Sequence, residues 1–498
     1  MSKQAYLKLE KRFRRIGVIR DINEVLHWDN ATKMPAGGGT GRSNQLAELC
    51  NINHSLLCDT ETGDLLDEAE KDSTLGSWQL ANLTAMRRKW SHAAALSEEL
   101  VLALSKASSK CETVWRAARA QDNFATVLPH MDNLLSLVRE CAQAKSESLG
   151  LSQYDALLDE YEPGGLSADI DVRFAELEAF LPGFLGQVLE NQKSNPPPAM
   201  PEGPFNVAAQ RKLGLQLMTA LGFDFKHGRL DVSLHPFCGG TPDDVRITTR
   251  FDENDFTSAI MGVLHETGHG LYERGLPQEW RYQPVGEALG MAIHESQSLL
   301  IEMQMSRSRP FLEFAAPLIR NAFGGTGPAW EPQSLYRNLI NVEPGFIRVD
   351  ADEVTYPMHV ILRYRLEKQM IVGDLALSDL PAAWNDGLES LLGIRPTNDR
   401  EGCLQDIHWY DGAWGYFPTY TLGAMTAAQL FAAALQSDPQ ISLGIAKGNF
   451  TALITWLGEN VHSLGCSLGP ANVIEKATGR PLSSVAFISH LKARYLSS

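Results

Sequence analysis

The sequence predicts a mainly α-helical fold that includes one small β-sheet near the middle of the chain. Residues up to about 192 show helical spacing, as where Leu96, Leu100 and Leu104 recur on one face. The stretch 78–151 is also rich in Ala, Leu, Glu, Lys and Arg, which are good helix formers. Segments with the alternation of strands follow later in the chain and are few, so helices should dominate.

A proline-rich segment at 195–204 interrupts this helical pattern. It holds five prolines and one glycine, a composition typical of loops and linkers. The segment separates a helical N-terminal part, about 1–195, from the remainder of the chain, about 205–498. A surface loop within one body fits the same composition equally well. We expect one continuous domain over 1–498, because α-rich chains of this length often form a single body.

The chain changes character after the proline-rich segment. Residues 230–234 and 245–251 alternate or carry β-branched side chains, with a Gly-Gly pair at 239–240 between them, which predicts two short strands. From Thr257 the pattern becomes helical again, and Gly275 is a natural stop for that helix. The small sheet should lie beside this helix. Further helices are predicted at residues 287–305, 358–370 and 424–437.

Composition and charge exclude several classes of protein. With 44% hydrophobic and 21% charged residues, the 498-residue chain suits a globular protein with a large core. The formal net charge of −16 argues against nucleic acid as the main partner, because binding phosphates needs a basic surface. Charged residues interrupt the first 29 residues, so we expect no signal peptide there. We also expect no membrane-spanning segment, because no apolar stretch is long enough to span a bilayer. Seven scattered cysteines indicate reduced thiols, so we expect a cytoplasmic location.

The most informative motif is His265-Glu266-Thr267-Gly268-His269. Two histidines four positions apart project from the same face of a helix, so both imidazoles can bind one metal ion. A catalytic zinc site needs such nitrogen ligands, an anionic oxygen ligand and an open position for water. The third ligand should come from the next predicted helix, where Glu287, His294 and Glu295 are the candidates. His294 and Glu295 project about 100° apart, so only one of them should face the metal. Spacing alone leaves the choice among the three candidates open.

Glu266 is poorly placed to bind the metal while its neighbour His265 does so. We expect it to act as a general base that takes a proton from a water bound to the metal and passes it to the leaving amine. The metal would also polarise the scissile carbonyl group. This arrangement predicts a metal-dependent enzyme that hydrolyses peptide or amide bonds.

Further segments, in the expected order, resemble the carboxypeptidase Taq family of metallocarboxypeptidases over nearly the whole chain. The two metal-site elements of that family correspond to residues 265–269 and to His294-Glu295-Ser296-Gln297. Its Asp-x-Arg-x-Thr element corresponds to Asp244-Val245-Arg246-Ile247-Thr248. The remaining matching segments are Leu26-His27-Trp28-Asp29, Met34-Pro35, Arg42, Tyr154-Asp155-Ala156-Leu157-Leu158, His235-Pro236-Phe237, Ile347-Arg348-Val349-Asp350-Ala351-Asp352 and Gly402-Cys403-Leu404-Gln405-Asp406-Ile407-His408-Trp409.

The resemblance implies a ligand set, a fold and an activity. It makes Glu295 the third ligand, so that His265, His269 and Glu295 would hold one divalent ion per chain, zinc or cobalt. It implies a two-lobed helical body around a deep groove, and a homodimer. The implied activity is removal of C-terminal residues from peptides with broad specificity, proline being disfavoured. One departure is Ile301-Glu302-Met303, where relatives often carry Trp-Glu-Asn, and it affects the expected shape of the pocket.

A carboxypeptidase must recognise the free α-carboxylate of its substrate. An arginine does so through two parallel hydrogen bonds. Arg348 is the first candidate for this role and Arg246 the second. The alternative for each arginine is a structural ion pair, for instance with Asp352 or with Asp244.

Other candidate substrate contacts lie in the same family elements. His235 opens the His-Pro-Phe element, and Gln405 and His408 would contact the substrate or hold the ligands, unless they are purely structural. Tyr416 and Tyr420 are candidates to donate a hydrogen bond to the developing oxyanion. The alternative for these two tyrosines is packing, which is the more common role of such residues beside Phe-Pro.

Two other functions share parts of this pattern. An endo-acting oligopeptidase would keep the three ligands and the base but would lack recognition of the carboxylate. A helical protein that binds peptides without catalysis would not need a base beside a full ligand set. For the peptidase we expect the metal at the floor of a groove, with walls from helices before Asn195 and after Met358.

Overall fold

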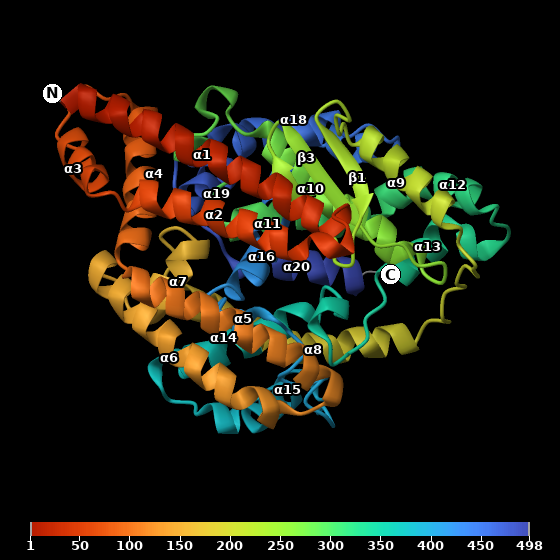
Figure 1. Cartoon of the computed structure of the whole chain (residues 1–498). Coiled ribbons are helices and arrows are strands. Elements are labelled where there is room, and N and C mark those ends of the chain that lie inside the picture. The colour runs from red at the N-terminus through yellow and green to blue at the C-terminus, as the bar shows by residue number, and fades with distance from the viewer. Residues whose placement is uncertain (1, 497–498) are drawn as a thin grey trace.

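The N-terminal part of the protein is a series of helices, most of them long (Figure 1). In the computed structural model, which describes residues 2–496, short polar side chains cap several of them. Asp59 accepts from the backbone N–H of Glu61, and Ser97 accepts from that of Leu100. Gly150 ends its helix in the left-handed conformation. The helices are α1 (Ser2–Thr32), α2 (Gly39–Leu57), α3 (Thr60–Ala69), α4 (Ser77–Ala94), α5 (Glu98–Gln121), α6 (Phe124–Leu149), α7 (Gln153–Tyr161) and α8 (Ser167–Lys193).

The proline-rich segment forms a loop between α8 and α9 (Val207–Ala220), as predicted. The small sheet follows, and then α10 (Phe256–Gly275), which ends at the predicted glycine. The sheet lies beside α10, because Leu230 and Ile247 from the strands share a hydrophobic cluster with Val263 of the helix. This arrangement confirms the expected sheet beside the histidine-bearing helix.

The sheet contains three strands among the described residues, where the sequence predicted two. The strands β1 (Gly228–Val232), β2 (Cys238–Thr241) and β3 (Asp244–Thr249) lie in the order β1-β3-β2. β1 runs parallel to β3, and β2 runs antiparallel to it. The Gly-Gly pair expected between strands lies inside β2. Gly240 has a φ of +83°, and a side chain there would collide with the backbone of Asp244, so the pair permits a tight hairpin.

The helix predicted at 287–305 begins later than expected and ends as a π-helix. α11 spans Met291–Leu299 and continues directly into a π-helix over Leu300–Ser306. It begins late because Gly290, immediately before it, has a φ of +49°, which lies outside the α-helical region. The periodic pattern of apolar residues did not reveal either irregularity.

The C-terminal part of the chain is again helical. α14 (Tyr356–Val372) matches the helix predicted at 358–370. α16 (Pro418–Ser437) begins earlier than the predicted 424–437, since its first turn starts with a proline and buries threonines rather than large apolar residues. None of the described helices combines the length and apolar character needed to cross a membrane. The other helices are α12 (Arg309–Phe323), α13 (Pro332–Leu339), α15 (Leu380–Leu392), α17 (Gln440–Ala446), α18 (Thr451–Asn460), α19 (Pro470–Thr478) and α20 (Ser484–Tyr495).

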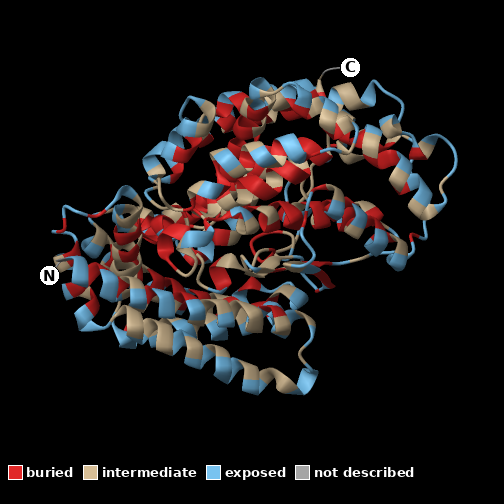
Figure 2. Ribbon diagram, turned by 90° about the horizontal axis from the view of Figure 1, so that it is seen from above, coloured by how far each residue is buried: buried red, intermediate tan, exposed pale blue. Residues whose placement is uncertain are grey.

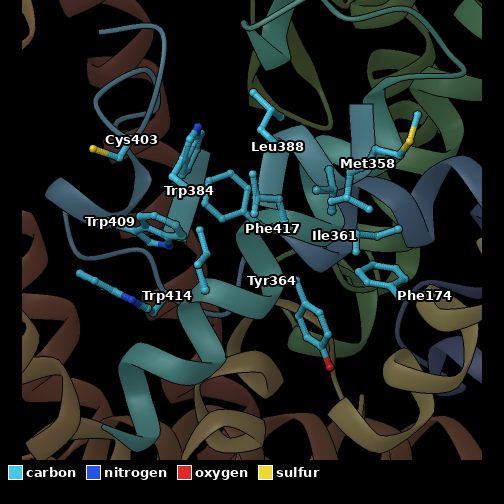
Figure 3. Close-up of a cluster of buried hydrophobic side chains, with 14 of the residues drawn as sticks. Phe174, Met358, Ile361, Tyr364, Trp384, Leu388, Cys403, Trp409, Trp414 and Phe417 are labelled. Atoms are coloured by element: carbon cyan, nitrogen blue, oxygen red, sulfur yellow. The ribbon is translucent and has the colours of Figure 1, made fainter. Parts of the chain in front are cut away.

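Two large hydrophobic clusters form the core, and α16 contributes to both. The first combines α5 to α8 with α14, α15 and α20, and includes Trp384, Trp409 and Phe417 (Figure 3). The second combines α9 to α13 with α17 to α19. α16 places Leu422 in the first cluster and Leu430 in the second. Buried residues follow the inner faces of the helices (Figure 2), and the predicted mainly α-helical, two-lobed body is confirmed.

Candidate metal centre

A cavity of about 960 Å³ contains the predicted metal site. Its lining comes from α10, α11, the π-helix and Arg307 after it, the segment 338–357, residues 416–424 of the α16 region, Pro236 to Cys238, and Phe487. The expectation that helices before Asn195 form a wall does not hold for this cavity, because no described residue ahead of Pro236 lines it. Those helices instead support the elements that carry the site, as α1 does by packing against β2.

The side chains of His265, His269 and Glu295 meet in this cavity. One ligand atom from each lies within 4.8 Å of the other two. Oε2 of Glu295 is 4.0 Å from Nε2 of His265 and 3.5 Å from Nε2 of His269. Two imidazole nitrogens and one carboxylate oxygen at these separations fit a divalent metal ion. The fold thus assembles the trio that the family resemblance implied.

Two glycines allow neighbouring helices to approach the ligand-bearing segments. A Cβ atom on Gly268, between the two histidines, would lie 2.5 Å from the backbone oxygen of Gln297 in α11. A Cβ atom on Gly423 in α16 would lie 2.9 Å from the Cβ of Glu295. Such distances are shorter than packed atoms tolerate, so α10, α11 and α16 can lie this close only because both residues are glycines. The close packing brings Glu295 within reach of the histidines.

The two other candidates for the third ligand have different partners. Nε2 of His294 lies 3.0 Å from Oε1 of Glu273. The carboxylate of Glu287 pairs with Lys89 at 2.7 Å and lines a different cavity. The structure therefore brings Glu295 to the histidines. His294 also lines the cavity, where its ring stacks on that of His269 with the centroids 4.4 Å apart, but its Nε2 faces Glu273 and it does not join the trio.

Glu266 lines the cavity without belonging to the ligand trio. It is only 6% exposed. Burial raises the pKa of its carboxyl group to about 7; the charge of His265 partly offsets this effect and that of Glu295 adds to it. A carboxyl group with a pKa near neutrality is suited to accept and release protons at neutral pH.

Arg348 lines the same cavity and is 4% exposed. Its Nη2 donates to Oδ1 of Asp406 at 2.6 Å, and its Nη1 donates to the hydroxyl of Tyr356 at 2.6 Å. Asp406 also accepts from Nε of Arg363 at 2.5 Å, so one carboxylate serves two guanidinium groups. The partner of Arg348 is thus Asp406 and not the Asp352 considered from the sequence. The three charged groups together carry one net positive charge beside the cavity.

Arg246 and His235 do not contribute to the lining of this cavity among the described residues. Nη2 of Arg246 donates to Asp244 at 2.6 Å, and its guanidinium group lies 4.2 Å from the ring centroid of Trp28. This is the structural ion pair considered as the alternative for Arg246. His235 is exposed, although Phe237, two positions later, does line the cavity.

Tyr416 and Tyr420 both line the cavity. Nε2 of His408 lies 3.2 Å from the hydroxyl of Tyr420, so His408 reaches the site through that tyrosine. Oε1 of Gln405 accepts from the backbone N–H of Arg348 at 2.8 Å. Among the described residues, neither Gln405 nor His408 lines the cavity, but each contacts a residue that lines it.

Glu302 is a residue of the site that the sequence reasoning missed. Its Oε2 lies 2.9 Å from Nδ1 of His265. The two positions that depart from the family pattern separate here, because Met303 lines the cavity while Ile301 is buried in the core. A signal for Glu302 was present: it stands seven positions after Glu295, which places both on one face of a continuous helix.

Known proteins match this chain over nearly its whole length. The model of the family described as Carboxypeptidase Taq (M32) metallopeptidase matches residues 8–495. Thermostable carboxypeptidase 1 of Thermus thermophilus is 35% identical over 502 residues, with 99% of this chain and 98% of the relative covered. Carboxypeptidase 1 of Bacillus subtilis is 33% identical over 499 residues, with 98% of each chain covered.

The fold agrees with a solved structure to the same extent. Metallocarboxypeptidase 1 of Trypanosoma cruzi is 38% identical and superposes with a TM-score of 0.97, with 99% of this chain and 100% of that chain covered. Sequence and fold therefore match carboxypeptidases over nearly the whole chain, and three side chains that could hold a divalent metal ion meet in the cavity. This metallocarboxypeptidase belongs to the carboxypeptidase Taq (M32) family.

Proposed function

We propose that this enzyme removes single residues from the C-terminus of peptides, with His265, His269 and Glu295 holding a zinc or cobalt ion and Glu266 acting as general base. The observation that carries the proposal is that one cavity is lined by the three ligands, a buried carboxyl group and a buried arginine. Two imidazole nitrogens and a carboxylate oxygen suit either ion. When bound, the ion would polarise the scissile carbonyl group and ease deprotonation of the attacking water.

Glu266 would accept the proton that the attacking water loses and then deliver it to the amine that leaves. Its burial suits both steps, because it raises the pKa of the carboxyl group to about 7. The protonated and the deprotonated form are then both populated near neutral pH. Tyr416 or Tyr420 would donate a hydrogen bond to the oxygen that becomes negative in the transition state. Burial raises the pKa of both tyrosines, so their hydroxyl groups retain the proton that this role requires.

Arg348 would bind the α-carboxylate of the substrate. An arginine has five N–H donors, and Arg348 uses Nε, one Nη1 hydrogen and one Nη2 hydrogen on Asp406 and Tyr356, which leaves two. The net positive charge that Arg348 and Arg363 share with Asp406 favours an incoming carboxylate at this buried position. The free donors and the uncompensated charge support Arg348 over Arg246, whose guanidinium group lies outside the lining.

Broad specificity and slow removal of C-terminal proline are proposed from family membership. A pool of peptides of mixed sequence, incubated with the metal-loaded enzyme and followed by mass spectrometry, tests activity and preference together. We expect successive loss of single C-terminal residues. Internal cleavage of peptides blocked at both ends would replace the proposal with an endo-acting oligopeptidase. Absence of metal-dependent turnover of an N-blocked dipeptide would indicate a peptide-binding protein instead.

We further propose that residues 1–498 act as one catalytic domain, as a homodimer in the cytoplasm. The first hydrophobic cluster joins helices from both sides of the proline-rich loop, which supports a single body. All seven cysteines are free thiols, which suits a reducing compartment. The dimer is proposed from family membership, and sedimentation of the purified enzyme tests it.

A further inference from the structure

We propose that Glu302 is a positioning residue of the metal centre, holding His265 in the tautomer and orientation that present Nε2 to the ion. The inference rests on the ligand set proposed above. Nδ1 of His265 lies 2.9 Å from Oε2 of Glu302, while its Nε2 lies 4.0 Å from Oε2 of Glu295. An imidazole that donates its proton from Nδ1 to a carboxylate keeps the lone pair on Nε2, the atom that faces the other ligands.

The carboxylate of Glu302 is itself held in place. Its Oε1 accepts from Nη2 of Arg307 at 2.7 Å, and Nη1 of Arg307 donates to the backbone oxygen of Leu339 at 3.0 Å. Each oxygen of Glu302 therefore has a partner, one a cation and one the imidazole. Because Glu302 is only 9% exposed, turning its side chain would break a charge-assisted hydrogen bond that is largely shielded from water. A carboxylate fixed in this way can fix the ring of His265 in turn.

The backbone around Glu302 gives an independent reason to assign it a role. Glu302 belongs to the π-helix Leu300–Ser306, and π-turns within helices occur frequently at functional sites. In an unbroken α-helix Glu302 would share a face with Glu295, seven positions earlier. The π-helix begins between the two residues, and the two acidic side chains approach opposite nitrogens of His265.

The second histidine of the motif lacks such support. Nδ1 of His269 is buried and has no hydrogen-bond partner among the described residues. The ion would therefore be held by one histidine that is fixed by a carboxylate and one that is fixed by packing alone. Loss of Glu302 should weaken metal binding through His265 without abolishing it.

The test is the zinc affinity of the metal-free enzyme, measured by competition with a chromophoric chelator. Loss of a carboxylate that orients a metal-binding histidine weakens metal binding by about 10- to 100-fold, which is the effect we expect for Glu302→Ala. Glu302→Gln keeps an oxygen acceptor without the charge, so about tenfold weaker binding is expected. The matched control is Asp159→Asn, which likewise removes a carboxylate that contacts a histidine and an arginine, here His92 and Arg88, all outside the cavity lining, and should leave zinc affinity unchanged.

Circular dichroism of each variant establishes that the comparison is made between folded proteins. Wild-type zinc affinity in folded Glu302→Ala would overturn the inference, and so would an equal loss in the Asp159→Asn control. If the alanine variant does not fold, wild-type affinity in Glu302→Gln overturns it equally. If the wild-type enzyme bound no zinc, this result would contradict the ligand assignment as well. A Glu302 variant that binds zinc normally leaves that assignment intact.

Discussion

Gly423 lies against Glu295 so closely that a Cβ atom at position 423 would sit 2.9 Å from the Cβ of the glutamate. Helix α16 therefore has no room for a side chain where it crosses the ligand-bearing α11. In Gly423→Ala, Glu295 must move away from the histidines or α11 must tilt. We expect less zinc in the purified variant and a loss of stability of about 1–3 kcal/mol, seen as a lower thermal midpoint.

The matched control for this substitution is Gly186→Ala in α8, where an added Cβ atom would meet nothing within 4 Å. Alanine is the better helix former, so this variant should keep its zinc and be slightly more stable than the wild type. Zinc content and midpoint at wild-type levels in Gly423→Ala would show that the close approach does not position Glu295.

Replacing a metal ligand and replacing the general base should have different effects on zinc content and on kcat. His269→Ala or Glu295→Ala removes a ligand atom, so each variant should purify with far less zinc. Glu266→Gln keeps the shape of the side chain and should retain the metal. It should nevertheless lose about 10²- to 10⁴-fold in kcat, because an amide cannot accept the proton of the attacking water. Metal analysis beside steady-state kinetics checks the prediction, and full occupancy in Glu295→Ala would contradict the ligand assignment.

The local pattern of the sequence was sufficient to predict that two histidines come together. His265 and His269 are separated by one helical turn, so their shared face follows from helix geometry alone. The resemblance added Glu295, which lies on another helix. Asp406 could not be predicted in this way, since its partners Arg348 and Arg363 stand 58 and 43 positions away and no periodicity joins them.

Departures of the fold from the prediction have equally local causes. Apolar spacing predicted a helix from residue 287, but the φ of +49° at Gly290 delays its start. A Gly-Gly pair usually marks a turn, and here it lies inside β2 because a hairpin needs glycine at Gly240. The walls of the groove depend on how helices far apart in the chain pack together. That is a property of side-chain fit across the core, which spacing within one helix does not encode.

Asp159 should make the stability of the fold depend on acid pH. Its Oδ2 accepts from Nε of Arg88 at 2.8 Å and lies 2.7 Å from Nε2 of His92, which ties α7 to α4. Burial alone would raise the pKa of Asp159, but the hydrogen bond with His92 and the charge of Arg88 outweigh it and lower the pKa to about 2. An unfolded aspartate titrates near 3.9, so this contribution is present above about pH 4 and is lost as the pH falls towards 2.

Thermal unfolding of the metal-free enzyme measures this contribution without interference from metal release. Asp159→Asn should lose about 2 kcal/mol of stability at neutral pH and progressively less as the pH falls below about 4. The midpoints of wild type and variant should therefore converge in acid. A difference between them that does not change with pH would mean that the pKa of Asp159 is not lowered in the folded state.

Tyr420 should act on the transition state more than on the bound substrate. If its hydroxyl group donates to the developing oxyanion, Tyr420→Phe should lower kcat by about 10²- to 10³-fold with little change in KM and normal zinc content. Tyr416→Phe in the same assay shows which tyrosine has this role, since both line the cavity. Because the ring of Tyr420 lies 4.9 Å from the Arg348 guanidinium, a change in KM instead would indicate that it acts through that arginine.

Arg348 should determine whether the enzyme prefers a free C-terminus. Amidation of the peptide removes the charge and one acceptor oxygen, but Asp406 still pairs with Arg348, so the guanidinium group is not left alone. The loss is then that of one charge-assisted hydrogen bond, about 1.5–3 kcal/mol, or about 10- to 100-fold in kcat/KM. Acetylating the N-terminus should matter little. Matched peptides that differ only in the terminal amide give this ratio directly.

Variants of the arginines show which of them produces that ratio. Arg348→Ala should erase most of the preference by slowing the free acid while leaving the amide nearly unchanged. Arg348→Lys should restore it in part, because lysine keeps the charge but cannot form two parallel hydrogen bonds. Arg246→Ala should retain the preference, since Arg246 is paired with Asp244 outside the cavity lining. If the ratio survives in Arg348→Ala and disappears in Arg246→Ala, the substrate must reach the sheet edge, and the carboxylate is bound there.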